Sequence, residues 1–435
     1  MTRTEPWLAC DVLVVGGGAS GVPAAIGAAR AGAKTILLEE DALVGGAAVD
    51  QFVSMPDGGP RSGVVAEYVG MLERDHSLAP HPVDRWWYYW YLPGAYVTVF
   101  EALLAAEPNL QVVRGARATG PVVETAGGRP RVTGAILPAP DGGEWRVTAR
   151  VVIDATGTGL FAEQAGCETR YGEDARSDFG EPVAPDTRSD RVQLVTWMYL
   201  CQKIGNGPPM DFSRLQRKPL ESGFSSVGAD PEAARARDCG VYLNWGCRVR
   251  CADTRDDAAL AAAQRTALDE MADDLALLRE SGYAVHLAPR IGVREQRRVL
   301  GEHVVSFVDM MEGRIPEDSV TVTSRPTDIW TEGKDQMDYP ETTTYGIPYR
   351  ALLPKGVEGL LVVGKSMSGT HLAMGSYRVQ CVLGCIGQAA GVAAAQAARA
   401  GSGVREVDPK ALLAEATASP QNLRIDPDAC TPPGC

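Results

Sequence analysis

The residues best placed to do chemistry lie in the first forty positions. The run Gly16-Gly17-Gly18-Ala19-Ser20-Gly21 is a G-x-G-x-x-G pattern, and the acidic pair Glu39 and Glu40 follows roughly twenty residues later. In this pattern the first glycine allows a tight turn, and the second lets the backbone approach a pyrophosphate. The third lets a helix pack closely on a sheet. A carboxylate at this distance accepts hydrogen bonds from ribose hydroxyls, so the pattern predicts a dinucleotide site.

Two strands and a helix must position these residues. Asp11–Val15 is a short apolar run typical of a buried parallel strand, residues 24–31 form a helix of small residues, and Lys34–Leu38 is a second strand that ends at Glu39. The helix N-terminus offers free N–H groups and a positive dipole end to phosphates. NAD and FAD share the same adenosine diphosphate, so this stretch alone does not separate them.

Composition narrows the class of protein. The 435 residues are enough for two or three cores, and 45% hydrophobic and 22% charged residues are ordinary for a soluble globular chain. The formal net charge of −13 argues against a nucleic-acid or anionic-membrane partner held by bulk electrostatics.

We expect no membrane span and a cytoplasmic protein. The nearest candidate span, Val382–Ala400, is rich in Ala and Gly and carries two glutamines and an arginine. Only three residues of apolar character precede the first strand, which leaves no room for the apolar region of a signal peptide. The ten cysteines are scattered, which suits reduced thiols in a cytosol.

No cysteine grouping predicts a metal site. Three pairs lie four or five residues apart: Cys247 and Cys251, Cys381 and Cys385, and Cys430 and Cys435. None shows the paired C-x-x-C or Cys/His pattern of zinc or iron–sulfur sites. We expect ordinary thiols and no metal, and the terminal pair is free to form an adventitious disulfide.

The first domain is interrupted and then resumes. Between Ala118 and Ile153 short β-prone runs alternate with glycine turns, which predicts an antiparallel meander that leads into Asp154-Ala155-Thr156-Gly157. Near the C-terminus, a strand over Gly359–Val363 runs into Gly364-Lys365-Ser366, and a helix of very small residues extends to about Ala400. We expect the small side chains of this helix to let a flat ligand lie close to its N-terminal turn.

We therefore predict an α/β fold. A Rossmann-like dinucleotide-binding domain with an inserted antiparallel β-meander covers residues 1–167 and returns at 341–405. A mixed α+β substrate domain covers 168–340, and a C-terminal helix and flexible tail cover 406–435. Other predicted helices cover 62–74, 97–106 and 256–281, the last with Gly282 as its C-cap.

Two stretches allow a structural and a functional interpretation. The aromatic block Trp86–Tyr91 is either a core or interface patch or a wall of a substrate pocket. The segment Pro289–Arg298 holds four arginines in an acidic protein. It is either a set of ion-pair partners or a site for an anionic or oxygen-rich substrate.

Three separated pieces together resemble a known family. The N-terminal fingerprint, the A-T-G turn and the C-terminal return are similar to FAD-dependent oxidoreductases of the glutathione-reductase-like, two-dinucleotide-binding-domain flavoprotein superfamily. The return contains Ile347-Pro348-Tyr349-Arg350, then Arg378-Val379 and Ala389-Ala390-Gly391, and residues 293–298 resemble a family segment R-E-x-R-R. The resemblance covers about 1–165 and 285–400 and implies FAD rather than NAD.

The resemblance implies a role for each matching position. The pyrophosphate would lie at Gly16 to Gly21, the adenosine ribose at Glu39, and the cofactor would pass Gly45 and Gly46. The adenosine half would rest on Ala155, Thr156 and Gly157, and the ribityl chain on Gly364, Lys365 and Ser366. The amides of Gly375 and Ser376, expected at a helix N-terminus beside Arg378, would face the flavin. In two places the chain departs from the family: Thr158 replaces an acidic residue after the A-T-G turn, and Lys365 replaces an arginine.

The implied activity is oxidation of a small organic substrate by hydride transfer to the flavin. We select His371 as the base, Arg294 as a carboxylate clamp or carbonyl polariser, and Tyr377 as a weaker candidate. The structural alternatives are that His371 only orders its loop and that Arg294 pairs with Glu295 or Glu302. No second G-x-G-x-x-G lies between the meander and residue 345, so we expect oxygen, a quinone or a protein to accept the electrons.

Rival functions remain open at this stage. They are a flavin-dependent monooxygenase or halogenase, and a non-catalytic flavoprotein redox partner. Covalent attachment of the flavin through His371 or a thiol, and a homo-oligomer, are compatible with the sequence.

Overall fold

The computed structural model describes residues 7–75, 90–205, 210–216, 241–331 and 340–425. Its main sheet has the strand order β3-β2-β1-β6-β5-β4, and β14 pairs with β6. The strands are β1 Leu8–Val15, β2 Thr35–Leu38, β3 Leu110–Val113, β4 Gly120–Ala126, β5 Arg129–Pro138, β6 Glu144–Asp154 and β14 Leu360–Val362.

This sheet joins the two predicted halves of the first domain. β1 pairs in parallel with β2 and β6, and β2 with β3, whereas β4, β5 and β6 form the antiparallel meander. β14, from the far end of the chain, adds in parallel to β6 through the pair Val362 and Asp154. The predicted α/β fold with its inserted meander is confirmed, and the carboxyl ends of β1, β6 and β14 meet at one edge of the sheet.

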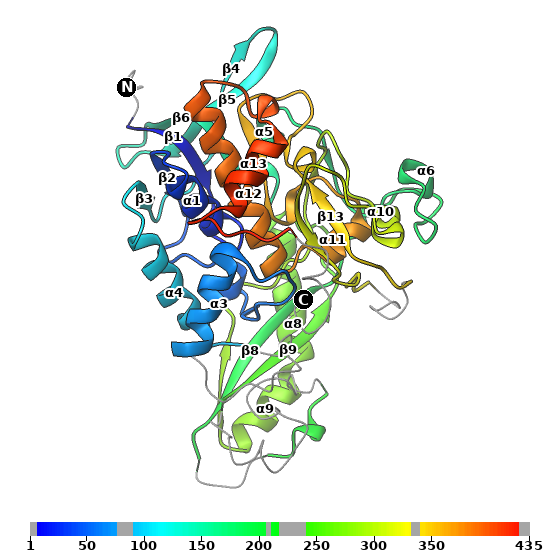
Figure 1. Cartoon of the computed structure of the whole chain (residues 1–435). Coiled ribbons are helices and arrows are strands. Elements are labelled where there is room, and N and C mark those ends of the chain that lie inside the picture. Colours follow the sequence, from blue (N-terminus) through cyan, green and yellow to red (C-terminus); the bar gives the residue numbers. More distant parts are fainter. Residues whose placement is uncertain (1–6, 76–89, 206–209, 217–240, 332–339, 426–435) are drawn as a thin grey trace.

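Two helices with small side chains form the centre of the molecule. α1 (Gly21–Arg30) packs along α12 (Gln380–Ala400), and α12 also contacts β1 and β6 (Figure 1). The approach is so close that a Cβ on Gly391 would lie 2.1 Å from the Ala24 carbonyl oxygen, and one on Gly387 would lie 2.1 Å from that of Ser20. The small residues in the middle of α12 therefore admit a neighbouring helix, whereas our expectation of a flat ligand concerns its N-terminal turn and stays a prediction.

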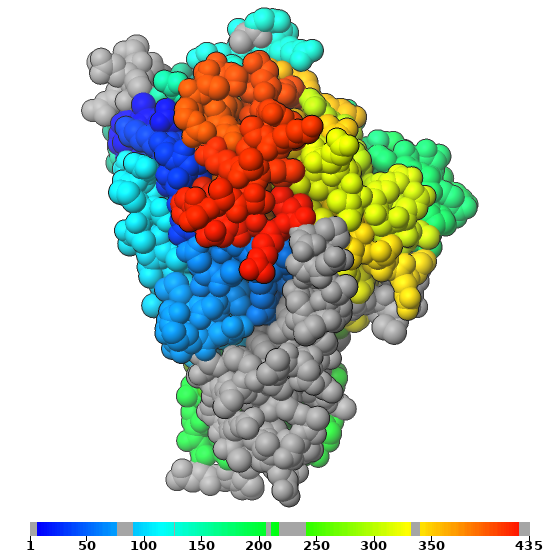
Figure 2. Space-filling model, in the orientation of Figure 1, coloured from blue at the N-terminus to red at the C-terminus, as the bar shows by residue number. Residues whose placement is uncertain are grey.

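Further helices cover this centre. They are α3 Gly63–Asp75, α4 Pro93–Ala105, α5 Leu160–Gln164 and α13 Pro409–Thr417, together with the short α2 Ala47–Asp50. Figure 2 shows the C-terminal segment, in orange and red, lying over the N-terminal residues in blue. The last described residues are tied down because the Gly63 N–H donates to the Asn422 carbonyl at 3.1 Å.

A second sheet lies in the predicted substrate domain. Its order is β10-β8-β9, with β8 Val195–Lys203, β9 Val241–Val249 and β10 Tyr283–Leu287, all antiparallel. α8 (Asp257–Glu270) and α9 (Ala272–Glu280) pack against it. Trp90 and Tyr91 are buried; Trp90 packs with Met198 and Leu243, while the rest of the aromatic block lies outside the described residues.

Shorter elements connect the two sheets. They are β7 Thr169–Arg170 with β11 Arg298–Val299, α6 Arg176–Phe179, α10 Phe307–Glu312, β12 Ser319–Thr323 with β13 Tyr345–Pro348, and α11 His371–Tyr377. Apolar residues between Val305 and Ile329 pack into the same core cluster as α1 and α12.

Three predicted helices differ in detail. The helix predicted over 256–281 is interrupted at Met271, whose ψ of −2° separates α8 from α9. The Met271 side chain is buried beside Gly246 of β9. The helix predicted from residue 97 begins at Pro93, because proline suits the first helical position. The helix of very small residues predicted to extend to about Ala400 begins at Gln380, so Gly375 and Ser376, expected at a helix N-terminus, lie in the separate helix α11, which ends at Tyr377.

The membrane expectation needs one correction. By length and composition α12 does qualify as a membrane span, contrary to our prediction, but 94% of its apolar window is buried inside the protein. A helix that is buried in the core of a protein can meet the same criteria of length and apolar composition.

The packing of α12 on α1 can be tested with two alanine substitutions. We expect Gly391→Ala to lower the free energy of unfolding by roughly 1–3 kcal/mol, because its methyl group overlaps the α1 backbone. Gly70→Ala in α3 is the control. No atom lies within 4 Å of its added Cβ, so it should be neutral or stabilising by up to about 1 kcal/mol. Equal thermal unfolding midpoints for the two variants would contradict this packing.

Candidate functional site

The glycine turn after β1 is built as the sequence predicts. Gly16 has φ +102°, and a Cβ there would meet the Ala155 carbonyl oxygen at 2.8 Å. A Cβ on Gly21 would lie 1.7 Å from the Gly16 carbonyl oxygen. These two glycines are therefore required by packing within the protein, and Ala155 forms the support beneath the turn.

Gly18 is different, because in the described part of the chain no other segment fills the space beside it. The nearest atom to a Cβ on Gly18 would be the Gly46 Cα, at 3.9 Å. The loop that carries Gly45 and Gly46 is anchored to the same turn, since the Gly45 N–H donates to the Gly17 carbonyl at 2.9 Å. Both glycines have positive φ, +128° and +52°. The turn and this loop thus leave room for a ligand along the backbone of Gly18.

Glu39 lies at the base of this space. It is buried, and its carboxylate accepts from the Gly17 N–H at 2.6 Å and the Asp41 N–H at 2.9 Å. Burial raises the pKa of Glu39 to about 7, although the two N–H donors oppose the rise. Glu40 points elsewhere: it is exposed and ion-pairs with Arg290 at 3.0 Å.

The A-T-G turn closes the same edge of the sheet. Asp154, fully buried at the end of β6, accepts from the Thr156 N–H at 3.0 Å, the Thr156 hydroxyl at 2.7 Å and the Ala162 N–H at 3.2 Å. Burial raises the pKa of Asp154, against these donors. Gly157, at φ +67°, then faces the Lys365 side chain: a Cβ added at Gly157 would lie 3.5 Å from Lys365 Cε.

The return segment joins this edge through Gly364. A Cβ on Gly364 would lie 3.5 Å from Ser20 Oγ and 3.9 Å from the Gly157 Cα. Lys365 donates from Nζ to the Val293 carbonyl at 2.6 Å, and burial together with the charge of Arg378 lowers its pKa to about 8. Ser366 is buried and donates to the Val363 carbonyl, which holds the loop. Three separated segments therefore converge on one cradle, with Ala19 and Ser20 at the start of α1.

Gly375 and Ser376 are not at a helix N-terminus as predicted. They lie in the last turn of α11, where Gly375 packs on Ile329. The Ser376 hydroxyl donates to the Arg325 carbonyl at 2.5 Å and lies 2.7 Å from the Tyr345 hydroxyl oxygen. The helix that begins nearest to them is α12, directly after Arg378 and Val379.

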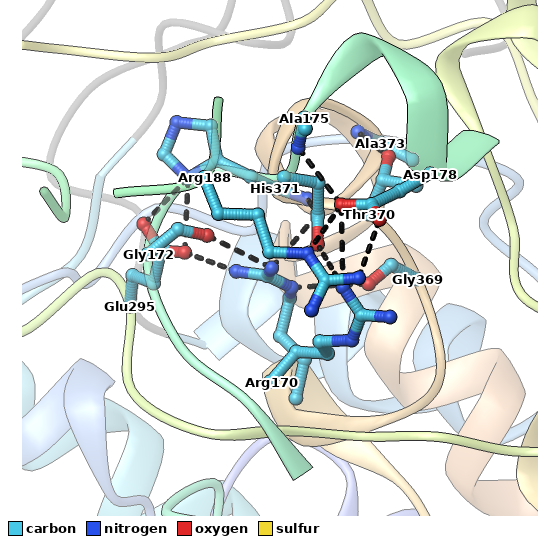
Figure 3. Close-up of polar contacts among 12 residues, drawn as sticks. Arg170, Gly172, Ala175, Asp178, Arg188, Glu295, Gly369, Thr370, His371 and Ala373 are labelled. Atoms are coloured by element: carbon cyan, nitrogen blue, oxygen red, sulfur yellow. Dashed lines mark hydrogen bonds and ion pairs between the residues drawn. The ribbon is translucent and has the colours of Figure 1, made fainter. Parts of the chain in front are cut away.

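His371 belongs to a buried polar network. Its Nδ1 lies 2.9 Å from Glu295, and its backbone N–H donates to Asp174 at 2.9 Å. Arg298, also buried, ion-pairs with both carboxylates and donates from Nε to the Gly369 carbonyl at 3.1 Å. Figure 3 shows the imidazole ring and Glu295 facing one another. Pairing with the Glu295 carboxylate places a proton on Nδ1, so Nε2 is the ring nitrogen left to exchange a proton.

Charge distribution keeps Glu295 ionised. Burial alone would raise the pKa of Glu295, but the charge and hydrogen bond of His371 and the charge of Arg298 hold it below the ordinary value. A cavity of about 80 Å³ adjoins His371 and is lined by Glu173, Glu181 and Leu372, among others. The predicted base thus has a fixed orientation and open space beside it.

Arg294 pairs with neither Glu295 nor Glu302. Its Nη1 donates to the Leu194 carbonyl at 2.7 Å and to the Thr196 hydroxyl at 2.5 Å. Burial and the positive charges of nearby arginines lower its pKa to about 9. The three other arginines of the basic segment have carboxylate partners: Arg290 with Glu40 and Asp41, Arg297 with Glu163, and Arg298 with Asp174 and Glu295.

Tyr377 and Arg378 end α11. The Tyr377 hydroxyl is buried and donates to the Met367 carbonyl at 3.3 Å. Burial raises the pKa of Tyr377. This hydrogen bond favours a role for Tyr377 in ordering the loop at residues 367–369. Arg378 Nη2 donates to the Asp328 carbonyl at 2.6 Å and to Gln193 Oε1 at 3.2 Å. Arg378 Nε is buried without a hydrogen-bond partner among the described residues.

The cysteines among the described residues are free thiols. Burial raises the pKa of Cys381 to about 12 and that of Cys385 to about 11. Their Sγ atoms donate to the Pro56 and Pro60 carbonyls at 3.2 and 3.3 Å. Within the described ranges, no group of three or more His, Cys, Asp or Glu side chains is arranged to hold a metal ion.

The fold and the cradle define a dinucleotide-binding flavoprotein of the Rossmann type. A family model described as FAD dependent oxidoreductase matches residues 11–415, nearly the whole chain. The chain belongs to the FAD-dependent oxidoreductase family, and its cofactor is FAD.

Several solved structures are similar in overall arrangement. The myxobacterial chondrochloren halogenase CndH is 14% identical over 94% of this chain and 78% of its own, with a TM-score of 0.45. A geranylgeranyl bacteriochlorophyll reductase-like protein from Thermoplasma acidophilum is also 14% identical, over 94% and 83%, with a TM-score of 0.45. OxyS anhydrotetracycline hydroxylase from Streptomyces rimosus is 16% identical over 97% and 70%, with a TM-score of 0.41.

The cradle fits FAD. The open backbone at Gly18 and the N-terminus of α1 suit the pyrophosphate, and Glu39 is placed for the adenosine ribose. When bound, FAD supplies a two-electron acceptor.

Some residues around the site were not predicted. Gln193, Asp174 and Asp328 carry no sequence signal, because their importance lies in contacts with residues far away in the chain. Glu295 was weighed only as an ion-pair partner, although its place in the R-E-x-R-R segment offered a signal.

FAD affinity should depend on pH through Glu39. Its protonated form prevails in the free protein below pH 7, and the ribose hydroxyls need the charged acceptor, so binding should strengthen as pH rises through about 7. We expect roughly tenfold weaker binding at pH 6 than at pH 8, measured by quenching of FAD fluorescence. Glu39→Gln should bind weakly at both values. A pH dependence that persists in Glu39→Gln would show that another group titrates.

Proposed function

We propose that this enzyme is a dehydrogenase or oxidase, which takes a hydride and a proton from a small organic substrate: the hydride passes to FAD and the proton to a base of the protein. The observation that carries the proposal is the buried His371–Glu295 pair, because a carboxylate held at Nδ1 orients the imidazole, and an oriented histidine is a common general base.

Each group in the network has a defined task. His371 Nε2 accepts the proton, Glu295 stabilises the resulting imidazolium, and Arg298 pairs with the same carboxylate and holds it in place. Arg294 orients the substrate. Tyr377 supports the loop that leads into His371 by its bond to the Met367 carbonyl.

The electrons then leave to oxygen, a quinone or a protein carrier. The chain carries one G-x-G-x-x-G before residue 345, and that one belongs to the FAD cradle. This supports an organic substrate, not a nicotinamide cofactor, as the electron donor.

The proposal is tested by mixing the FAD-loaded protein with fractionated metabolites in the absence of oxygen. We expect one fraction to bleach the flavin absorbance and yield a product two electrons more oxidised. In His371→Gln, bleaching by that fraction should slow by about 10²- to 10⁴-fold while FAD content stays unchanged. His286→Gln, at an exposed position of β10, should behave like the parent protein.

Two results would contradict the proposal. One is an oxygenated or halogenated product that forms only when the reduced protein meets oxygen. The other is unchanged bleaching in His371→Gln, which would leave His371 as a residue that orders its loop.

A further inference from the structure

A second polar cluster adjoins the His371–Glu295 pair, since the Gln193 N–H donates to Glu295 at 3.3 Å. Its members are Gln193, Arg294, Asp328, Trp330 and Arg378. Gln193 Oε1 accepts from Arg378 Nη2 at 3.2 Å and from the Trp330 N–H at 3.4 Å. The adjacent residue, Leu194, accepts from Arg294 at 2.7 Å. One dipeptide thus anchors both arginines, which come from segments more than eighty residues apart.

Hydrogen-bond donors in this cluster outnumber its acceptors. Gln193 is 1% exposed, and its Nε2 has no hydrogen-bond partner among the described residues. The acceptor role of Oε1 is fixed by its two donors, so the free atom is the N–H₂ group. Arg378 Nε is also buried without a partner. Both bonds of Arg294 within the described ranges use Nη1, which leaves its Nε and Nη2 available.

Positive charges in this cluster also outnumber negative ones. Arg378 pairs with Asp328 at 3.2 Å, and Arg325 pairs with Asp57 at 2.9 Å. Among the described residues, the hydrogen-bond partners of Arg294 are a carbonyl and a hydroxyl, and it shares the charge of Asp328 with Arg378. Burial would raise the pKa of Asp328, but the charges of the neighbouring arginines hold it below the ordinary value.

The cluster borders the FAD cradle. Val293, next to Arg294, accepts from Lys365 Nζ at 2.6 Å, and Lys365 packs against Gly157. Arg378 lies directly before Val379, the N-cap of α12. Two side chains of the cluster are partly exposed to solvent: the Arg378 side chain is 14% exposed and that of Asp328 is 23% exposed. A ligand held here would lie beside the cofactor.

We propose that Arg294, Arg378 and the Gln193 amide bind the carboxylate of an organic-acid substrate. A guanidinium edge and an amide N–H₂ together match a planar group with two acceptor oxygens. The pyrophosphate of FAD is served at the opposite side of the cradle by the N-terminus of α1, so this cluster has a separate ligand. The inference deepens the proposed function and rests on it.

The test uses the oxidised, FAD-loaded full chain without turnover. The protein is titrated with acetate, succinate and benzoate, with the matching uncharged amides, and with inorganic phosphate. Binding is followed by the flavin difference spectrum and by calorimetry. We expect saturable binding of at least one carboxylate, no binding of its amide, and weaker binding of phosphate.

Variants assign that binding to Arg294. Arg294→Gln should weaken the carboxylate at least about tenfold without loss of FAD, and Arg294→Lys should recover part of it, because a point charge lacks the guanidinium fork. Arg297→Gln is the matched control from the same segment, since Arg297 pairs with Glu163 at 2.8 Å, and it should leave binding unchanged.

Several outcomes would overturn the carboxylate site. These are no saturable response to any of the acids, equal binding of acids and amides, tighter binding of phosphate, unchanged binding in Arg294→Gln, or loss of FAD from that variant. Carboxylate binding without anaerobic bleaching by any metabolite would instead overturn the dehydrogenase proposal. Bleaching by an uncharged substrate, with no carboxylate binding, would overturn only this site.

Discussion

The contact between α1 and α12 is the constraint on which the rest of the structure depends. Gly387 and Gly391 lie against the carbonyls of Ser20 and Ala24 so closely that neither position tolerates a Cβ in this geometry. This contact brings the C-terminal return onto the first helix, and β14 then pairs with β6. The cradle at the sheet edge exists because residues more than three hundred positions apart are held in register.

The proposed proton transfer and carboxylate binding lie where this framework meets the second sheet. Glu295 bonds to His371 on one side and accepts from the Gln193 N–H at 3.3 Å on the other. Gln193 in turn contacts Arg378. The proton acceptor and the arginine cluster are therefore parts of one hydrogen-bonded arrangement. A substitution at Glu295 would disturb both, so the two functions are best separated at His371 and Arg294.

Local backbone requirements were predictable from the sequence, and long-range contacts were not. The turn at Gly16, the acid at Glu39 and the meander all rest on neighbours in the chain, and the structure has each in its expected place. Gly375 and Ser376 were misplaced because a run of small residues does not reveal where α11 ends and α12 begins. The packing of α1 on Gly387 and Gly391 was not predicted, because a run of small residues in the sequence does not show which helix will lie against it.

The most direct test of the account is amide hydrogen exchange, measured by mass spectrometry with and without FAD. A single cradle built from both ends of the chain predicts that FAD protects the turn at Gly16–Gly21, the turn at Ala155–Gly157 and the loop at Gly364–Ser366 together. Protection confined to the N-terminal turn, with the other two segments unchanged, would contradict the shared cradle.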